Sequence, residues 1–453
     1  MVFSSITFIY LFLPICLLIY YVAPFKAKNI ILLLFSLLFY SLGEPRFLLV
    51  ILACILVVYI GARLLEKYDN KLLFGSLITI CLAPLIYFKY TNFFIENINR
   101  WFNLNLNLLS ILLPLGISFY TFQMISYLVD VRRKEIKPEK NILNLALYIC
   151  FFPQLVAGPI VTYADMKFQI EMRKTTTEQF SDGILHFVTG LGKKVLIANQ
   201  LGELCNLYNH ENATVLFTWM YAIAFSLQIY FDFSGYSSMA IGLGKMFGFN
   251  LPQNFNYPFM SSTIKEFWKR WHITLSSFFK NYVYIPLGGS RCSVRRNIFN
   301  LFIVWFLTGF WHGADWQFIC WGLFFFICLC VEKFIIKNRL PKLLSRVGTL
   351  FAIMFSFLIF SSNNFSDMLF KLKHLILGGL SDQNTVFIFN NFAFLLLISI
   401  IGSTKLISYL YDKHIKGRKM SAILEPVFIA IVLILSTAYL IDGAFNPFLY
   451  FRF

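Results

Sequence analysis

Charged residues are scarce in this sequence of 453 residues. Asp, Glu, Lys and Arg make up 13% of it, against about 25% in a typical soluble domain, whereas hydrophobic residues make up 58%. This composition excludes a soluble globular enzyme. Disorder is excluded too, because disordered chains lack apolar residues and this one has 54 phenylalanines and a mean hydropathy of +0.69. A polytopic membrane protein remains.

Sequence signatures of metal and serine chemistry are also missing. The sequence contains no HExxH, GxSxG or Walker A motif. Its nine cysteines include no CxxC pair, so we interpret them as small core side chains rather than metal ligands or disulfides. We therefore expect chemistry that depends on histidine and substrate positioning, with no metal site and no tightly bound cofactor.

Long apolar runs predict the membrane spans. A spanning helix needs about 20 apolar residues, so the length allows roughly 11–13 spanning helices with short loops. Runs in the middle of the chain, about residues 110–330, are shorter, more polar or broken by Gly and Pro. Such segments are tolerated at membrane depth only if they are buried in protein or line a wet cavity. We predict an all-α polytopic protein with re-entrant or broken helices around a polar chamber.

The chain is interpreted as a single integral membrane domain, residues 1–453. We assign peripheral helices to about 1–107, the catalytic core to about 108–335, and C-terminal helices with an aromatic tail to 336–453. The first apolar run, from about Ile6 to Val22, has no basic stretch before it and no small-residue cleavage site after it. We expect a retained first helix rather than a cleaved signal.

Basic residues predict the orientation. The net charge is +17, which in a membrane protein mainly marks cytoplasmic loops rather than a nucleic-acid partner, although an anionic cytosolic substrate would also favour it. The first, third and fifth loops are the basic ones, and the fifth contains Arg132, Arg133, Lys134, Lys137 and Lys140. The N-terminus is therefore predicted to lie outside. Lys371 and Lys373, in a predicted outer loop, depart from this rule.

Two of the six histidines lie in unusual surroundings. His312 lies at the junction of two strongly apolar runs, and His272 lies in a segment that mixes charges with tryptophans. An ionisable group in apolar surroundings is costly and by default a functional candidate. An imidazole exchanges a proton near neutral pH, so a buried one suits general base catalysis. The alternative is a histidine bonded to a neighbouring carbonyl group.

Basic and amide residues around His272 indicate a ligand with phosphate groups, which the basic inner face would attract. They are Asn254, Asn256, Lys269, Arg270, Lys280 and Arg291. Gly288-Gly289 could also turn its backbone amides toward a phosphate. That pair alone is a weak signal, and a plain turn is the better interpretation of it.

Eight strings of the sequence carry a family resemblance. They are MVFSSITFIYLFLP at 1–14, LPLGISFYTFQMISYLVDVRR at 113–133, FFPQLVAGPI at 151–160, DFSGYSSMAIGLGKMFGF at 232–249, PQNFNYPF at 252–259, KEFWKRWHITLSSFFKNYVYIPLGGSR at 265–291, TGFWHGADWQFICWG at 308–322 and FLYFRF at 448–453. Each string is moderately specific, and their order and spacing are highly specific. Together they resemble the membrane-bound O-acyltransferase family, in particular its bacterial alginate and peptidoglycan O-acetyltransferase branch.

The resemblance implies a core of spanning helices around a funnel or tunnel through the membrane. It implies that His312, in the family's WHG string, is catalytic and that His272, in its RWHxxLS string, lies nearer the cytosol. The terminal string implies that Tyr450 lies near the active site, as an acyl carrier. On residues alone the aromatic tail would be interpreted as an anchor at the outer membrane interface.

We accordingly assign His312, His272 and Tyr450 as catalytic. The residues assigned to substrate binding are Lys269, Arg270, Asn254, Asn256, Arg291 and Trp311. The sequence also departs from the family pattern: Asp is expected at the positions of Ser238 and Asn281, and Asn is common at that of Asp315.

The predicted activity is O-acyl transfer in the bacterial cytoplasmic membrane. An acetyl group is expected to pass from a cytosolic thioester such as acetyl-CoA, across the membrane, to a hydroxyl of a cell-envelope or secreted polysaccharide. A thioester is already activated, so the reaction needs a base and a placed acceptor rather than a metal. The resemblance implies that an extracytoplasmic acetyltransferase partner with a serine nucleophile completes the transfer.

Two alternatives stay open at this point. One is D-alanyl transfer to teichoic acid, as in a related branch, although there the terminal tyrosine motif lies on a separate small protein. The other is a transporter or flippase, which would explain the spans and the buried polar groups. Transporters often contain inverted repeats, and we find no convincing internal repeat. The acceptor polysaccharide is open among alginate, peptidoglycan, cellulose and capsule.

Overall fold

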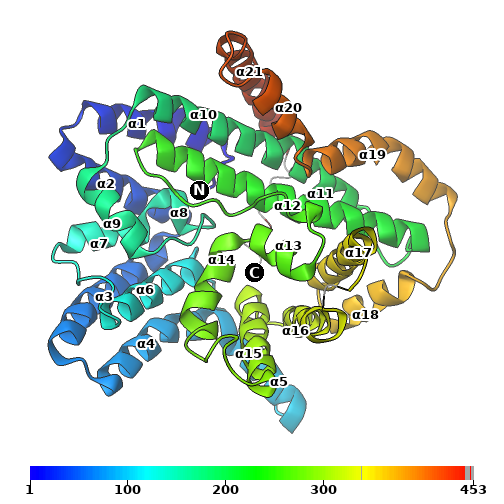
Figure 1. The fold of residues 1–453 in the computed structure, drawn as a ribbon, viewed down its shortest axis with the longest axis horizontal. Helices are drawn as coiled ribbons and strands as arrows, with labels where there is room; N and C mark the ends of the chain where they lie inside the picture. The colour runs from blue at the N-terminus through cyan, green and yellow to red at the C-terminus, as the bar shows by residue number, and fades with distance from the viewer. Residues whose placement is uncertain (338, 444–448, 450–453) are drawn as a thin grey trace. The chain divides into compact units, whose positions relative to one another are not determined.

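The computed structural model describes residues 1–453 apart from 338, 444–448 and 450–453 (Figure 1). The described residues form helices joined by loops, with no strand among them. Eight helical segments in this part are long and apolar enough to cross a membrane: Phe25–Gly43, Pro45–Tyr68, Lys71–Phe102, Val215–Met246, Trp316–Ile336, Lys342–Phe360, Gln383–Gly402 and Ser421–Asp442. The predicted all-α polytopic class is confirmed. The larger number of spans and the central funnel stay predictions.

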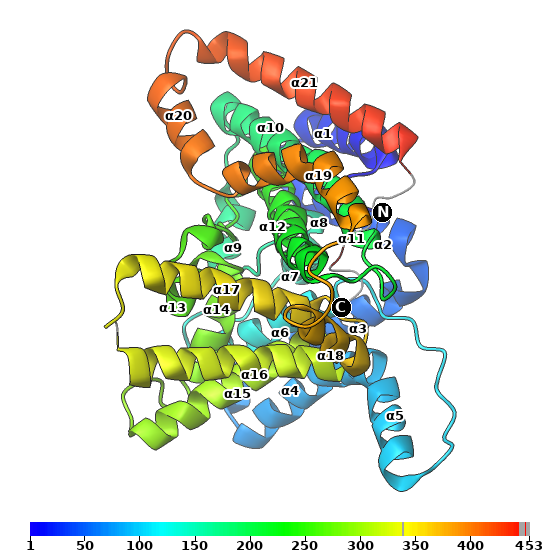
Figure 2. The ribbon, with the colours of Figure 1, turned by 90° about the vertical axis from the view of Figure 1, so that its right-hand side faces the viewer.

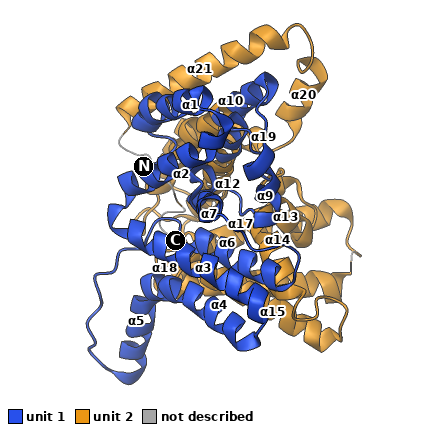
Figure 3. Cartoon of the chain, turned by 90° about the vertical axis from the view of Figure 1, so that its left-hand side faces the viewer, with its two compact units in different colours: residues 1–187, 239–252 blue, residues 188–238, 253–453 orange. Residues whose placement is uncertain are grey.

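The chain divides into two compact units, residues 1–187 with 239–252 and residues 188–238 with 253–453 (Figure 3). Helices α10 (Thr177–Gly192) and α12 (Val215–Met246) contribute to both. The proposed division into peripheral helices, core and tail stays a prediction.

The first unit is built around a buried helix and an aromatic core. Helix α6 (Ile117–Arg132) packs against α3 (Leu48–Tyr68) and α4 (Lys71–Leu85), and α2 (Phe25–Gly43) packs against α7 (Ile142–Cys150). The rings of Phe3, Phe8 and Phe39 are all fully buried. The other helices of this unit are α1 (Leu13–Val22), α5 (Thr91–Phe102), α8 (Phe152–Leu155) and α9 (Tyr163–Met172).

Helix α6 begins later than the apolar run predicts. The run starts near residue 108, whereas the helix begins at Ile117. Pro114 disfavours helical backbone in the residue before it, and Gly116 has a φ of 72°, in the left-handed region that glycine adopts easily. Any Cβ on Gly116 would lie 2.5 Å from the carbonyl oxygen of Leu155, so the close packing also requires glycine there.

The second unit contains a tightly packed hairpin of α15 (Val294–His312) and α16 (Trp316–Cys330). A Cβ on Gly309 would lie 2.4 Å from the carbonyl oxygen of Phe318, and one on Gly322 would lie 2.4 Å from that of Trp305. Helix α16 also packs against α17 (Lys342–Phe360), and Figure 2 shows the two side by side. The other helices of this unit are α11 (Asn199–Asn206), α13 (Ile264–Arg270), α14 (Ile273–Phe279), α18 (Phe365–His374), α19 (Gln383–Gly402), α20 (Leu406–His414) and α21 (Ser421–Asp442).

The predicted broken helices occur in the second unit. Helices α13 and α14 have seven residues each and are separated by Trp271 and His272. The N-terminus of α13 is capped twice. Thr263 Oγ1 accepts a hydrogen bond from the Glu266 N–H, at 3.0 Å, and the Glu332 carboxylate accepts one from the Ile264 N–H, at 2.6 Å. These caps fix the short helix that leads into His272.

Candidate active site

His312 is the last residue of α15 and has an exposed fraction of 3%. Its ring lies 4.9 Å from the ring of Trp321 on α16 and 5.5 Å from that of Phe360 at the end of α17. The next residue, Gly313, has no room for a side chain, because a Cβ there would lie 2.1 Å from the Phe318 ring. Aromatic rings from three helices therefore enclose this imidazole and separate it from bulk water.

His272 lies between α13 and α14 and is fully buried. Its φ of 42° is unusual for a residue other than glycine and marks local strain of a kind that clusters at functional sites. Burial lowers the pKa of His272, which lies outside the eight apolar spans, to about 3. The imidazole is therefore neutral at physiological pH.

Asn254 fixes the tautomer of His272. Its Oδ1 accepts hydrogen bonds from the main-chain N–H of Thr274, at 3.2 Å, and from the Thr274 hydroxyl, at 3.0 Å. The same oxygen lies 3.1 Å from His272 Nδ1. Because that oxygen can only accept, Nδ1 of the neutral ring carries the proton and Nε2 carries the lone pair.

The ring of Trp311 lies close to both histidine rings. Its ring lies 4.9 Å from that of His312 and 6.2 Å from that of His272. The ring of Phe233, on α12, contacts His272 from another side at 4.7 Å. The structure thus brings four of the sequence-predicted residues into one buried cluster: His272, His312, Asn254 and Trp311.

The other predicted binding residues either have partners of their own or are exposed. Arg270 forms an ion pair with Glu266, at 2.8 Å, and donates a hydrogen bond to the carbonyl oxygen of Asn256, at 3.2 Å. Asn256 in turn donates its main-chain N–H to the carbonyl oxygen of Arg270, at 2.9 Å. Lys269 and Arg291 are exposed.

Gly288 and Gly289 form the plain turn that we favoured. Their main-chain N–H groups donate to the carbonyl oxygens of Ile285 and Tyr284, both at 2.9 Å. The two amides are thus already hydrogen-bonded within the turn, and neither is left to hold a phosphate.

A buried ion pair on α12 was missed as a site. Asp232 Oδ1 lies 2.7 Å from Lys194 Nζ, and the two side chains are 2% and 3% exposed. Asp232 lies in an apolar run of the sequence. Nothing in the sequence pairs it with Lys194, which lies in a weakly apolar segment next to a second lysine. Tyr450, the third predicted catalytic residue, lies outside the described residues.

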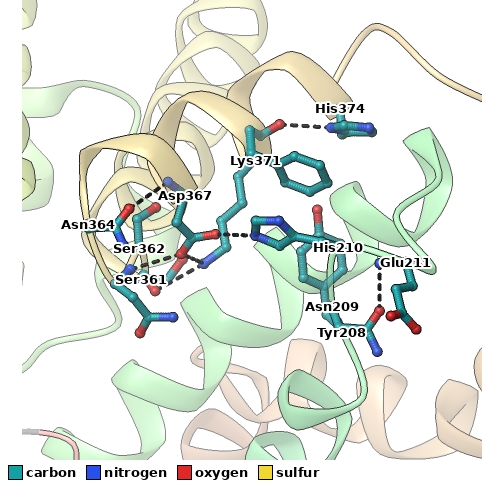
Figure 4. Close-up of polar contacts among 12 residues, drawn as sticks. Tyr208, Asn209, His210, Glu211, Ser361, Ser362, Asn364, Asp367, Lys371 and His374 are labelled. Atoms are coloured by element: carbon teal, nitrogen blue, oxygen red, sulfur yellow. Dashed lines mark hydrogen bonds and ion pairs between the residues drawn. The ribbon is translucent and has the colours of Figure 1, made fainter.

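A second ion pair of the same unit lies on α18. Figure 4 shows Asp367 between Lys371, at 3.1 Å, and His210, at 3.2 Å. Burial raises the pKa of the Asp367 carboxyl. The Asn363 N–H and the Lys371 ammonium lower it by more than burial raises it, so the pKa lies below its usual range. The pair stabilises the end of α17, since Lys371 also donates a hydrogen bond to the carbonyl oxygen of Ser361.

The described residues thus form a multi-pass helical fold in which two buried histidines lie among aromatic rings. In a comparison with protein families, residues 133–370 match the membrane-bound O-acyltransferase family. The chain belongs to this family, and the resemblance seen in its strings is confirmed. This membership makes it an enzyme and argues against the transporter alternative.

Three relatives indicate the range of activities among similar chains. The probable alginate O-acetylase AlgI of Pseudomonas aeruginosa is 39% identical over 80% of this chain and 72% of its own length. The peptidoglycan O-acetyltransferase of Helicobacter pylori is 35% identical over 84% of this chain and 81% of its own. The teichoic acid D-alanyltransferase of Bacillus subtilis is 30% identical over 55% of this chain and 69% of its own.

Proposed function

We propose that this protein takes an acetyl group from a cytosolic thioester, acetyl-CoA, and passes it across the membrane for O-acetylation of a cell-envelope or secreted polysaccharide. The proposal is supported by the two O-acetylating relatives, which are more similar and match more of the chain than the D-alanyltransferase does. The single observation that carries the catalytic part is the enclosure of His312 by aromatic rings at the α15–α16 junction.

His312 acts as the general base. In its neutral form it accepts the proton of the attacking hydroxyl while the hydroxyl oxygen forms a bond to the thioester carbonyl carbon. The carbon–sulfur bond then breaks, and the leaving thiolate takes the proton from the imidazolium. An enclosure with little water protects the thioester from hydrolysis and strengthens every electrostatic interaction in it. We assign the attacking hydroxyl to the phenol of Tyr450, so that the acetyl group is carried as an ester of the Tyr450 oxygen.

His272 and Asn254 have a supporting role on the cytosolic side. Because the tautomer of His272 is fixed, its ring presents the lone pair of Nε2 in one direction. The contact with Trp311 makes His272 part of the wall beside His312. The exposed cations Lys269 and Arg291 attract the anionic donor, and Arg270 and Asn256 hold the loop that carries Asn254.

We place the protein in the bacterial cytoplasmic membrane with its N-terminus outside. An extracytoplasmic acetyltransferase with a serine nucleophile receives the acetyl group and transfers it to the polysaccharide. Membrane lipid surrounds the apolar spans, and the described residues include many large apolar side chains exposed on them, such as Leu49, Leu72 and Phe394.

Donor labelling distinguishes acetyl from D-alanyl transfer. Membranes that contain this protein are incubated with acetyl-CoA labelled in the acetyl group, and in parallel with D-alanine labelled and activated as a carrier-protein thioester. We expect base-labile label in protein and polysaccharide from acetyl-CoA only. Label from the D-alanyl donor alone would replace this proposal by the alternative, and membranes without the protein provide the background.

A further inference from the structure

The buried carboxylate of Asp232 needs a reason, because a charge within a membrane span is costly and is kept mainly for function. Asp232 lies in the middle of α12, a helix of 32 residues that is mostly buried. Its first oxygen is paired with Lys194, which comes from the π-helical turn η4 (Lys193–Ala198). Such turns inside longer helices occur frequently at functional sites.

The local packing brings this pair together. Gly235 lies one turn after Asp232, and a Cβ on it would lie 2.8 Å from the carbonyl oxygen of Gly190 and 3.1 Å from the main-chain nitrogen of Lys194. Only glycine therefore allows α12 to approach η4 closely enough for the two side chains to meet. Lys194 also donates a hydrogen bond to Asn199 Oδ1, at 2.8 Å, which fixes the direction of its ammonium.

The second carboxylate oxygen of Asp232 binds the main chain of Leu449. The main-chain N–H of Leu449 donates a hydrogen bond to Asp232 Oδ2, at 2.9 Å, across 217 residues of sequence. Leu449 is buried, with an exposed fraction of 7%. A main-chain hydrogen bond to a charged acceptor is stronger than one between neutral groups, so the carboxylate is a firm attachment for this residue.

We propose that Lys194 and Asp232 are positioning residues that hold Leu449 so that the next residue, Tyr450, is delivered for acyl transfer. The inference rests on the proposed function of Tyr450. Consecutive Cα atoms are about 3.8 Å apart, so an attachment at Leu449 limits the reach of the following side chain. Replacing a buried ion pair by apolar residues of similar volume is often neutral for stability, so stability alone does not explain why this pair is present.

Two double variants separate the hydrogen bond from the ion pair. Lys194→Met/Asp232→Leu removes both charges and the acceptor, whereas Lys194→Met/Asp232→Asn removes both charges but keeps a side-chain oxygen for the Leu449 N–H. Neither leaves a buried unpaired charge. Lys194→Met/Asp232→Ala replaces the first variant if leucine does not fit. The matched control is Asp367→Leu/Lys371→Met, which removes the buried ion pair of Figure 4, a pair with no contact to Leu449 among those described.

The first readout is hydrogen–deuterium exchange of the C-terminal peptic peptide in detergent. We expect exchange at Leu449 to be about tenfold faster in the leucine variant than in wild type, because one hydrogen bond is lost. The asparagine variant and the control should retain wild-type protection. Equal exchange in the leucine and asparagine variants would overturn the assignment of Asp232 as the attachment point.

The second readout is acetyl transfer. We expect kcat to fall at least about tenfold in the leucine variant, with KM for acetyl-CoA unchanged, and to recover in the asparagine variant. Faster exchange with unchanged kcat would refute the positioning role. Tyr450→Phe in the wild-type background tests the function separately: full activity with a protected C-terminal peptide would remove Tyr450 from the mechanism, while the exchange result for Asp232 would stand.

Discussion

Substitution of Gly309 by alanine should disturb the active site from inside the α15–α16 hairpin. The added Cβ would lie 2.4 Å from the Phe318 carbonyl oxygen and 3.2 Å from the Gly322 Cα. Ordinary contact requires about 3.5 Å, so the two helices must separate locally by about 1 Å. Overpacking of this kind costs about 1–3 kcal/mol of unfolding free energy.

The loss of activity should exceed what the lower stability alone would cause, because Gly309 lies three residues before His312 on the same helix. A misplacement of about 1 Å can reduce a catalytic rate about 100-fold. The measurement is acetyl transfer together with thermal unfolding in detergent. The control is Gly348→Ala on α17, where a Cβ meets nothing within 4 Å and alanine should stabilise the helix by about 1 kcal/mol. Equal activity and stability of Gly309→Ala and Gly348→Ala would refute this account of the hairpin.

Three further predictions concern other parts of the molecule. Asn254→Leu removes the acceptor of the buried His272 Nδ1–H and should lower the unfolding free energy by about 1–3 kcal/mol, so unchanged denaturant unfolding would contradict the contact. The folded-state pKa of Asp367 lies below its unfolded value, so the stability it contributes is present above the unfolded pKa and is lost as pH falls through the folded one. Below about pH 4, the free energy of unfolding should therefore fall less in Asp367→Asn than in wild type, and equal falls would contradict the lowered pKa of Asp367. In the predicted orientation, a membrane-impermeant maleimide should label Asn105→Cys on intact cells and Lys137→Cys only after permeabilisation, and the reverse pattern would invert the topology.

Several features of the site could be predicted from the sequence because they are local. The strings around His272 and His312 combine a histidine with tryptophans inside apolar surroundings, and both residues are buried among aromatic rings in the structure. Broken helices are also predicted for the middle of the chain, where the apolar runs are short or interrupted, and the short helices α13 and α14 lie there. Membership of the family follows from the order of the strings and is confirmed by comparison.

Other features depend on contacts between distant segments and could not be predicted. The Asp232 ion pair joins two segments of weak periodicity, and the bond from Leu449 spans 217 residues. Arg270 was assigned to the ligand from its charge, but a carboxylate one helical turn earlier already pairs with it. Sequence composition does not show which cations are neutralised by neighbours and which are left to attract a substrate.

The central claim is that His312 is the base for acyl transfer, and one comparison tests it most directly. Membranes that contain the His312→Ala variant, together with the polysaccharide and its extracytoplasmic partner, are assayed for incorporation of labelled acetyl from acetyl-CoA. His414→Ala, an exposed histidine on α20, is the matched control. We predict a loss of about 10²–10⁴-fold for His312→Ala at normal membrane abundance, and wild-type rates for His414→Ala. Near-normal acetylation with His312→Ala would contradict the account.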